Sequence, residues 1–194
     1  MFRSAKVMPG NVVVVIGCGG IGLSTINGAE IAGAGRIIAV DVADNKLEMA
    51  LRFGATDVVN ASKVDPVQAV REMASGGVEH AFECIGLPLT ARQAVEMLAP
   101  FGVATIMGVF PAASEISIPG EVLLQQRRVQ GSFLGSALVS IDIPRLVEHY
   151  LRGRLKLDEL VSKRIMLEDV NLGFEDMKGG KVARSVVVFP DVNT

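Results

Sequence analysis

The chain has 194 residues, which corresponds to about one domain and part of another at roughly 150 residues per domain. Nineteen Lys and Arg residues against 21 Asp and Glu residues give a net charge of −2, without the basic excess that binding to nucleic acid requires. Hydrophobic residues make up 49% of the chain and charged residues 21%. This composition excludes a disordered chain, and no uninterrupted apolar run approaches the roughly 18 residues of a membrane span.

Cysteine content and the start of the chain bear on location. Two cysteines, Cys18 and Cys84, cannot build a disulfide scaffold or a four-cysteine zinc site, and low cysteine use suits a reducing compartment. Only five apolar residues run together before Gly17, too few for the core of a signal peptide. The sequence therefore predicts a soluble protein of the cytoplasm, without a membrane or nucleic-acid partner.

Short apolar runs rich in β-branched residues recur along the first two thirds of the chain, as expected of strands buried on both faces. The expected strands are residues 12–16, 37–40, 57–59, 78–82, 103–107 and 129–133. Segments with the pattern of amphipathic helices lie between them, at 21–32, 43–53, 66–73 and 90–98. Strands alternating with helices at this spacing form parallel sheets with right-handed crossovers. The pattern predicts an α/β fold, a doubly wound parallel sheet of about six strands with helices on both faces.

The alternation changes after residue 133. Helices are expected at 143–151 and 167–177, and short strands at 163–165 and 185–189, separated by glycines. Such a segment is too short to form an independent core. We therefore divide the chain into a sheet domain, residues 1–133, and a short α+β extension, residues 134–194, which must pack on the sheet domain or on something outside this chain.

A glycine-rich turn at residues 17–22, GCGGIG, fits the pattern G-x-G-x-x-G and lies between an expected strand and an expected helix. In such turns Gly17 would permit the tight turn, Gly19 would let the backbone approach a pyrophosphate, and Gly22 would let helix and strand pack closely. Gly20 and Ile21 lie at the helix N-terminus, which favours negative charge. The turn predicts a dinucleotide site of the Rossmann type.

Asp41 ends the next expected strand, 19 residues after Gly22, close to the spacing of the acid that binds an adenosine ribose. A carboxylate there accepts hydrogen bonds from ribose hydroxyls and repels a 2′-phosphate, and no arginine follows in Val42-Ala43-Asp44. NAD is therefore favoured over NADP. Two alternatives remain open: glycines that serve only helix packing with Asp41 as a helix cap, and a site for S-adenosylmethionine.

Together with further segments, these motifs make the chain resemble the zinc-dependent alcohol dehydrogenases of the medium-chain dehydrogenase/reductase family. Besides the glycine turn and the segment RIIAVD that ends in Asp41, the resemblance includes FECIG at 82–86, GSFLGS at 131–136 and KVARSVVVF at 181–189. It covers almost the whole chain. It implies an oxidoreductase with a Rossmann cofactor-binding domain.

The resemblance also implies roles for particular residues. Lys46 matches a residue that binds the adenosine ribose beside Asp41, and Arg184 matches an arginine that pairs with the pyrophosphate. Cys84, Ile85 and Gly86 match residues that line the adenine side of the cleft. The segments that hold the nicotinamide carboxamide are matched by Met107, Gly108, Val109, Ser132 and Leu134.

In the resembled family, hydride passes between an alcohol or aldehyde and the nicotinamide, and a zinc ion lowers the pKa of the bound alcohol. The zinc ligands, the proton relay and most of the substrate pocket belong to an N-terminal catalytic domain that does not match any part of this chain. Residues 134–194 match the returning part of that domain. We therefore expect no catalytic or metal-binding residue here, and no activity from this chain alone. His80 and Cys84 are four residues apart, but no third ligand is near them in sequence.

Two other functions remain open at this stage. One is a zinc-independent quinone or enoyl reductase of the same superfamily that uses NADPH, against which Asp41 argues. The other is a stand-alone dinucleotide-binding module without catalysis.

Residues 114–119, SEISIP, alternate polar and apolar side chains and predict an exposed edge strand after the fifth strand. In the resembled family the corresponding region joins the sheets of two subunits across a two-fold axis. We expect a homodimer whose interface includes Ile116, Ile118, Val122, Leu123 and Leu124.

Overall fold

A computed structural model describes residues 4–180 and 182–189 of the chain. Contacts within the chain define two compact units, Met1–Leu155 and Lys156–Thr194, and each is considered by itself. The division expected between residues 133 and 134 rests on the change of sequence pattern and on the resemblance, and it stays a prediction.

The first unit is built on one sheet of six strands in the order β3-β2-β1-β4-β5-β6. The strands are β1 (Val12–Ile16), β2 (Arg36–Asp41), β3 (Asp57–Asn60), β4 (Val78–Glu83), β5 (Leu98–Ile106) and β6 (Arg128–Gly131). Every neighbouring pair is parallel. The predicted doubly wound parallel sheet is thereby confirmed, including its number of strands.

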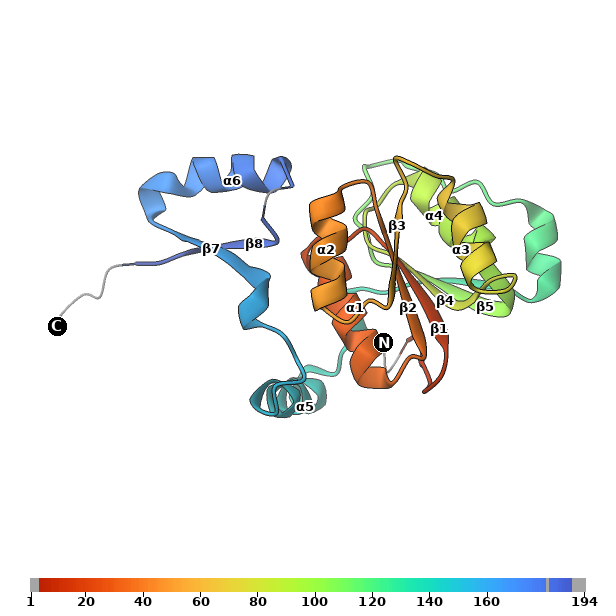
Figure 1. The fold of residues 1–194 in the computed structure, drawn as a ribbon, viewed down its shortest axis with the longest axis horizontal. Helices are drawn as coiled ribbons and strands as arrows, with labels where there is room; N and C mark the ends of the chain where they lie inside the picture. The colour runs from red at the N-terminus through yellow and green to blue at the C-terminus, as the bar shows by residue number, and fades with distance from the viewer. Residues whose placement is uncertain (1–3, 181, 190–194) are drawn as a thin grey trace. The chain divides into compact units, whose positions relative to one another are not determined.

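Helices cover both faces of this sheet (Figure 1). They are α1 (Gly20–Ala32), α2 (Asp44–Arg52), α3 (Pro66–Met73) and α4 (Pro88–Glu96). Local sequence explains several ends: the Asp65 carboxylate caps α3 by accepting the Gln68 N–H at 2.9 Å, and Pro66 occupies the first helical position. Gly33, at a φ of +84°, ends α1 in the left-handed conformation that glycine adopts without strain.

The core follows from the continuous apolar strands. Val13, Val14 and Val15 of β1 have no exposed surface, because the sheet buries this central strand on both faces. On one side of the sheet, Val70 of α3 and Val95 of α4 belong to a buried cluster that includes strand residues. Completely burying a side chain of this size contributes about 1.5–3 kcal/mol, so β1 and its neighbours provide a rigid base for the turns that follow them.

Strand β5 begins five residues before its expected start at Val103. Leu98 already pairs with Val78, and the register then shifts before His80 pairs with Val103. Phe101, at a φ of +65°, lies within this irregular stretch. The remaining elements of the sheet domain differ from their expected bounds by a few residues.

Residues 114–119 form no strand, which corrects the expectation of an edge strand. β6 pairs with β5 and so takes the place beside it. Ile118 packs against the buried core cluster, and Val122 belongs to that cluster. Leu123 and Leu124, which are 52% and 86% exposed, and the half-buried Ile116 are the members of the predicted interface that keep apolar surface.

The first unit ends in a helix that is amphipathic but uncovered. After the short 3₁₀ turns η1 (Gly120–Gln125) and η2 (Leu134–Ser136) comes α5 (Val139–Leu151), which starts four residues before its expected position. Asp142 stabilises this start because its carboxylate accepts the Leu138 N–H at 2.8 Å. None of the side chains of α5 is buried.

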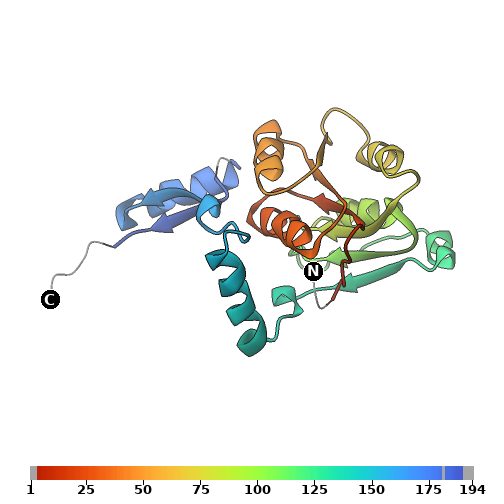
Figure 2. The same ribbon diagram turned by 60° about the horizontal axis from the view of Figure 1, so that its bottom comes forward.

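The second unit is a small α+β arrangement, as predicted, and its elements can be followed in Figure 2. It consists of η3 (Asp158–Leu160), β7 (Val161–Ile165), η4 (Leu167–Asp169), α6 (Val170–Lys178) and β8 (Arg184–Val187). The two strands are parallel, and α6 lies so close to β7 that a Cβ on Gly173 would come 2.7 Å from Ile165 Cδ1. Lys163 and Asp176 form an ion pair at 3.0 Å between the strand and the helix.

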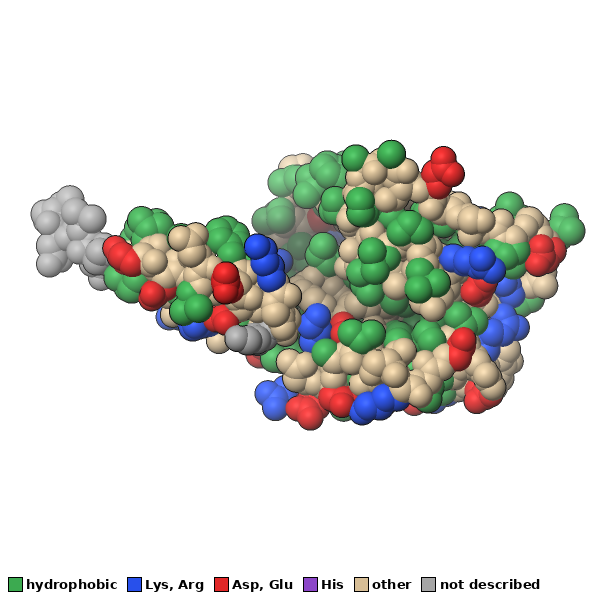
Figure 3. Space-filling view, turned by 90° about the horizontal axis from the view of Figure 1, so that it is seen from above, with side chains coloured by type: hydrophobic (Ala, Val, Ile, Leu, Met, Phe, Trp, Pro, Cys, Tyr) green, Lys and Arg blue, Asp and Glu red, His purple; other side chains and the backbone are tan. Residues whose placement is uncertain are grey.

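Two surface properties bear on partners. Charges of both signs are interspersed over the face drawn in Figure 3, without a broad basic area on the residues described there. In the described part of the chain, no helix combines the length and apolar character needed to cross a membrane.

Candidate cofactor-binding site

The strand order places the topological switch point between β1 and β4. From β1 the chain runs outward through β2 to β3, and from β4 it runs the other way through β5 to β6. In doubly wound sheets, ligands bind beyond the carboxyl ends of the strands at this point. The predicted site residues at or after the ends of β1, β2, β4, β5 and β6 therefore lie together at the carboxyl ends of the strands.

The glycine turn after β1 is tightly packed at two of its three motif glycines. Gly17 has a φ of +93° and its N–H donates to the Val40 carbonyl at 2.8 Å, which ties the turn to β2. A Cβ on Gly22 would overlap the Gly17 carbonyl oxygen, so α1 can approach β1 only with glycine at this position. These are the functions expected of the first and third motif glycines.

The second motif glycine, Gly19, is exposed, and a Cβ built on it would meet nothing within 4 Å. It precedes α1, and no side chain caps that helix terminus. The first helical hydrogen bond is donated by Leu23 to the Gly19 carbonyl at 2.8 Å, which leaves the amides of Gly20, Ile21 and Gly22 as donors for a ligand. Open space and orphan amides together suit an anionic group.

Asp41 lies beside this turn and is 7% exposed. Its Oδ2 accepts the Cys18 N–H at 2.8 Å, and its Oδ1 accepts the N–H groups of Val42 at 2.8 Å and Ala43 at 3.1 Å. A carboxylate has about four acceptor sites, so about one remains for a ribose hydroxyl. Asp41 therefore holds the glycine turn against the end of β2, a contact that the spacing of the motif alone does not predict.

Lys46 and the two cysteines complete this side of the site. Burial is the main cause that raises the Cys18 pKa far above its usual range, Asp41 raises it further, and the nearby Lys46 ammonium opposes them. Burial also raises the pKa of Cys84 to about 12. Both thiols are free and protonated at neutral pH. They therefore act as apolar side chains that line the site and not as nucleophiles.

The turn after β4 is organised by Glu83, a residue of the FECIG segment to which neither the motifs nor the resemblance assigned a role. Glu83 is completely buried, and its Oε1 accepts the N–H groups of Ile85 at 2.9 Å and Gly86 at 2.8 Å and the Thr90 hydroxyl at 2.8 Å. The available signal was a glutamate that ends the strand after the apolar pair Ala81 and Phe82, immediately before Cys84.

The turn after β5 lies directly against the turn after β4. Met107 and Gly108 donate their N–H groups to the Glu83 carbonyl at 2.9 and 3.1 Å. A Cβ on Gly86 would overlap the carbonyl of Val109, whose own side chain is 86% exposed. The structure thus brings together the two segments that the resemblance assigned to opposite halves of the cofactor.

The remaining predicted residues follow β6 or lie in the second unit. Ser132 donates its N–H to the Ile106 carbonyl at 3.0 Å, which keeps it beside the end of β5, and Leu134 is 79% exposed two residues further on. Arg184 begins β8 and is exposed. It belongs to the second unit, so its role at the pyrophosphate stays a prediction.

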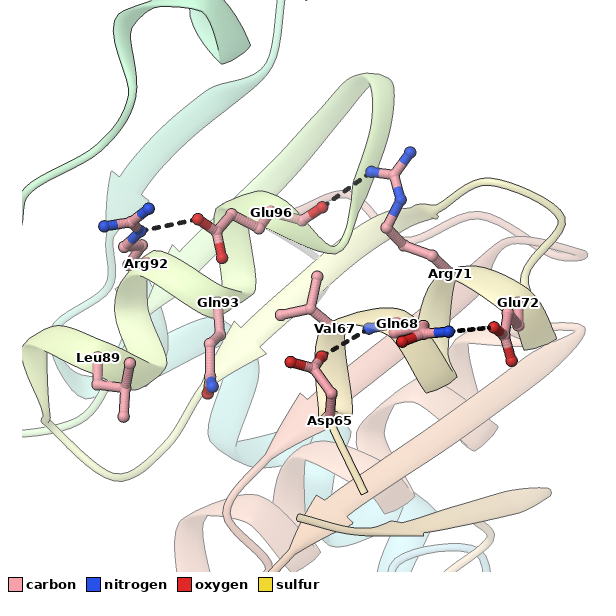
Figure 4. Close-up of a pocket in the computed structure, with 9 residues that line it drawn as sticks. All are labelled: Asp65, Val67, Gln68, Arg71, Glu72, Leu89, Arg92, Gln93 and Glu96. Atoms are coloured by element: carbon pink, nitrogen blue, oxygen red, sulfur yellow. Dashed lines mark hydrogen bonds and ion pairs between the residues drawn. The ribbon is translucent and has the colours of Figure 1, made fainter.

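A cavity of about 710 Å³ lies elsewhere, in a groove between α3 and α4 (Figure 4). Its polar groups pair with one another: Arg92 with Glu96 at 2.7 Å, Gln68 with Glu72 at 2.8 Å, and Arg71 with the Glu96 carbonyl at 3.0 Å. None of its lining residues belongs to the turns that follow β1, β2 or β4. We therefore place the candidate site at the strand ends, where unpaired backbone donors exist.

Metal ligands do not gather in the described residues, where no group of three or more His, Cys, Asp or Glu side chains could hold an ion. His80 and Cys84, considered as a pair from the sequence, have different surroundings, since His80 lies within β4 and Cys84 follows its last residue. His80 Nε2 is 3.2 Å from Asn11 Oδ1, whereas Cys84 Sγ is 3.9 Å from Thr25 Oγ1 in α1.

His80 leads to a prediction about acid stability. Burial lowers its pKa, although the nearby Glu79 carboxylate opposes the shift. The unfolded chain takes up a proton below about pH 6.5, while the folded chain resists it, so the free energy of unfolding should fall as the pH drops below that value. Urea denaturation at pH 7.5, 6.5 and 5.5 measures this loss. The His80→Asn variant should show a smaller loss over the same range, and an equal loss in both proteins would assign the effect to other groups.

The fold and the turn after β1 define a doubly wound α/β domain of the dinucleotide-binding, Rossmann type. Residues 20–152 match the family described as zinc-binding dehydrogenase, and the chain belongs to this family. The resemblance to zinc-dependent alcohol dehydrogenases is thereby confirmed.

Individual relatives agree with this assignment. The chain is 41% identical over 188 residues to S-(hydroxymethyl)glutathione dehydrogenase of Synechocystis sp., covering 95% of this chain and 51% of that protein. It is 37% identical to alcohol dehydrogenase class-3 of Cereibacter sphaeroides, covering 97% of this chain and 53% of the relative. The structure of benzyl alcohol dehydrogenase from Acinetobacter calcoaceticus matches with a TM-score of 0.94 at 31% identity, covering 97% of this chain and 52% of that one. The chain thus spans about half the length of the relatives it matches, and these relatives do not favour the alternative of a non-catalytic module.

Proposed function

We propose that this chain binds NAD as the cofactor-binding part of an alcohol dehydrogenase, an oxidoreductase that transfers hydride between an alcohol or aldehyde and the nicotinamide. The observation that carries the proposal is the uncapped N-terminus of α1, with open space at Gly19, beside the buried carboxylate of Asp41. The family assignment supplies the reaction class, and the full activity is proposed for the longer protein.

The proposal assigns residues of this chain to each part of the cofactor. In the proposal, the amides of residues 20–22 bind the pyrophosphate, while Asp41 and Lys46 bind the adenosine ribose. Cys84, Ile85 and Gly86 line the adenine side. The backbone of residues 107–109, with Ser132 and Leu134, holds the carboxamide, and Arg184 adds a positive charge at the pyrophosphate. The nicotinamide supplies the hydride chemistry when bound, and these residues bind and orient it.

The preference for NAD over NADP rests on Asp41. Its carboxylate carries a negative charge where NADP has a 2′-phosphate, and its three backbone donors hold it in place. A solved structure of a zinc-binding dehydrogenase from Sinorhizobium meliloti, 30% identical over 86% of this chain with a TM-score of 0.80, is described as bound to NADP. Both cofactors therefore have to be tested.

Calorimetric titration of the purified 194-residue chain with NAD, NADP and S-adenosylmethionine tests the proposal. We expect saturable binding of NAD, weaker binding of NADP and no binding of S-adenosylmethionine. Binding of S-adenosylmethionine alone would refute the assignment, and tighter binding of NADP would refute the role of Asp41.

Zinc and the reacting alcohol are proposed to lie in the portion of the longer relatives that this chain does not match. On that basis residues 1–194 alone bind cofactor without turning over alcohols, which an NADH absorbance assay would reveal. We propose the cytoplasm as the location, since two free thiols suit a reducing compartment.

The proposed enzyme is a homodimer, and its interface leads to a further prediction. Ile116, Leu123 and Leu124 present apolar surface near the open edge of the sheet, and a two-fold contact would use this patch twice. Changing Ile116 and Leu124 to Lys should convert a dimer to a monomer in light scattering across a tenfold dilution. Ile118 is left unchanged because it packs on the core. A monomer in the unaltered protein at high concentration would contradict the prediction.

A further inference from the structure

We propose that Glu83 is a positioning residue for the cofactor, whose buried carboxylate fixes the Ile85–Gly86 turn in the shape required for binding. The inference rests on the proposed binding of NAD at the strand ends and deepens it. It adds a residue that does not touch the cofactor and that neither the glycine motif nor the spacing of Asp41 indicates.

The Glu83 carboxylate is buried, and three hydrogen bonds offset the unfavourable free energy of its burial. Glu83 ends β4 and has no exposed surface, and burying a charged or polar group without hydrogen bonds is strongly unfavourable. Three donors converge on Oε1: the Ile85 and Gly86 amides and the Thr90 hydroxyl. Two of the three are consecutive backbone amides, so the side chain determines the path of the chain immediately after β4.

The turn after β4 and the turn after β5 pack closely against each other. A Cβ on Gly86 would overlap the Val109 carbonyl, and a Cβ on Gly108 would overlap the Gly86 amide and lie 2.6 Å from Glu83 Oε2. Oε2 itself is buried without a hydrogen-bond partner among the described residues. The carboxylate therefore lies directly beneath both turns, and a shift of one turn must displace the other.

Ile85 connects Glu83 to the glycine turn after β1. The Ile85 side chain is 44% exposed, and its Cγ1 lies 2.5 Å from where a Cβ on Gly17 would be. Ile85 thus packs against the glycine turn while its amide is held by Glu83. Through this one residue, the carboxylate sets the spacing between the turns that follow β1 and β4, where the switch point lies.

A purely structural anchor would lower stability without changing affinity in the molecules that remain folded. A positioning residue must alter NAD affinity in the folded protein. Thr90 offers a matched control, because Thr90→Val removes a donor to the same oxygen at the start of α4 and leaves both turn amides bound. We expect Thr90→Val to lower stability and to keep NAD affinity within about twofold.

The test compares Glu83→Leu, Glu83→Gln and Thr90→Val with the unaltered chain by NAD titration, with folding checked by circular dichroism. Glu83→Leu removes the acceptor, and the loss of two amide hydrogen bonds should weaken NAD binding by about tenfold or more. Glu83→Gln retains one acceptor oxygen and should restore affinity to within about threefold. Equal affinity of folded Glu83→Leu and the unaltered chain would overturn the inference, and so would a tenfold loss in folded Glu83→Gln.

Hydrogen exchange provides a measurement that needs no variant, in case Glu83→Leu does not fold. The Ile85 and Gly86 amides should be protected in the free protein before NAD is added. Exchange as fast as in exposed loops would overturn the inference. If the unaltered chain itself does not bind NAD, the proposed function fails. If it binds and all variants bind equally, only the role of Glu83 fails.

Discussion

Replacing Gly22 by alanine is expected to cost the protein about 3 kcal/mol of its free energy of unfolding, the upper end of the range for overpacked sites. The added Cβ would overlap the Gly17 carbonyl oxygen. That oxygen belongs to backbone whose own N–H is bonded to Val40, so it has little freedom to move. Helix α1 would have to shift away from β1, and NAD binding should be lost with it.

The Gly19→Ala variant is the matched control, with the same added atom three residues earlier. Gly19 has φ −76° and ψ −170°, a conformation open to any residue, and its Cβ would meet nothing. Stability should change by less than about 0.5 kcal/mol. NAD affinity should nevertheless fall by about tenfold or more, because the methyl group occupies the space through which a pyrophosphate reaches the amides of α1.

Urea denaturation and NAD titration of both variants separate the two effects. The expected pattern is loss of stability in one variant and loss of affinity alone in the other. Full NAD affinity in Gly19→Ala would show that the pyrophosphate does not bind at the glycine turn. Unchanged stability in Gly22→Ala would contradict the close contact between α1 and β1.

The sheet was predictable because its central strands β1 and β2 are apolar runs and the helices α2, α3 and α4 are amphipathic. Burial on both faces leaves such strands with a composition that a turn or loop rarely has. β5 was less predictable, since Pro100 and Gly102 interrupt its first half and its early pairing of Leu98 with Val78 depends on tertiary contact. Residues 114–119 show the converse case, an alternating pattern that forms no strand, while β6 takes the place beside β5.

The candidate site also contains parts that the sequence predicts and parts that it does not. The glycine turn and Asp41 follow local spacing rules, so their proximity could be anticipated. The hydrogen bonds that Asp41 accepts from the Cys18 N–H and that Glu83 accepts from the Thr90 hydroxyl depend on how the side chains lie in the folded chain. No periodicity encodes such bonds. The most informative unassigned feature of the sequence was therefore a charged residue at the end of a buried strand.

Asp41→Asn is expected to disturb both the glycine turn and the choice of cofactor. The carboxylate accepts backbone N–H groups on both oxygens, whereas an amide has a single acceptor oxygen and places N–H₂ donors on the other side. Whichever way the amide turns, at least one backbone donor faces another donor, which costs about 1–3 kcal/mol when the site is buried. NAD affinity should fall. The ratio of NAD affinity to NADP affinity should decrease by about tenfold, because the charge that repels a 2′-phosphate is removed.

Asp44→Asn makes the same chemical change three residues later and serves as its control. The Asp44 carboxylate is exposed and pairs with Lys63 at 2.8 Å on the surface, where such ion pairs contribute little. We expect the ratio of NAD to NADP affinity to stay within about twofold of the unaltered value in this variant. Titration with both cofactors and urea denaturation of each variant give the measurement. An unchanged affinity ratio in Asp41→Asn would remove Asp41 from the ribose site, while unchanged stability would show that its bonds to the turn are dispensable. The two results are independent, so the experiment distinguishes a residue that selects the cofactor from one that only holds the turn.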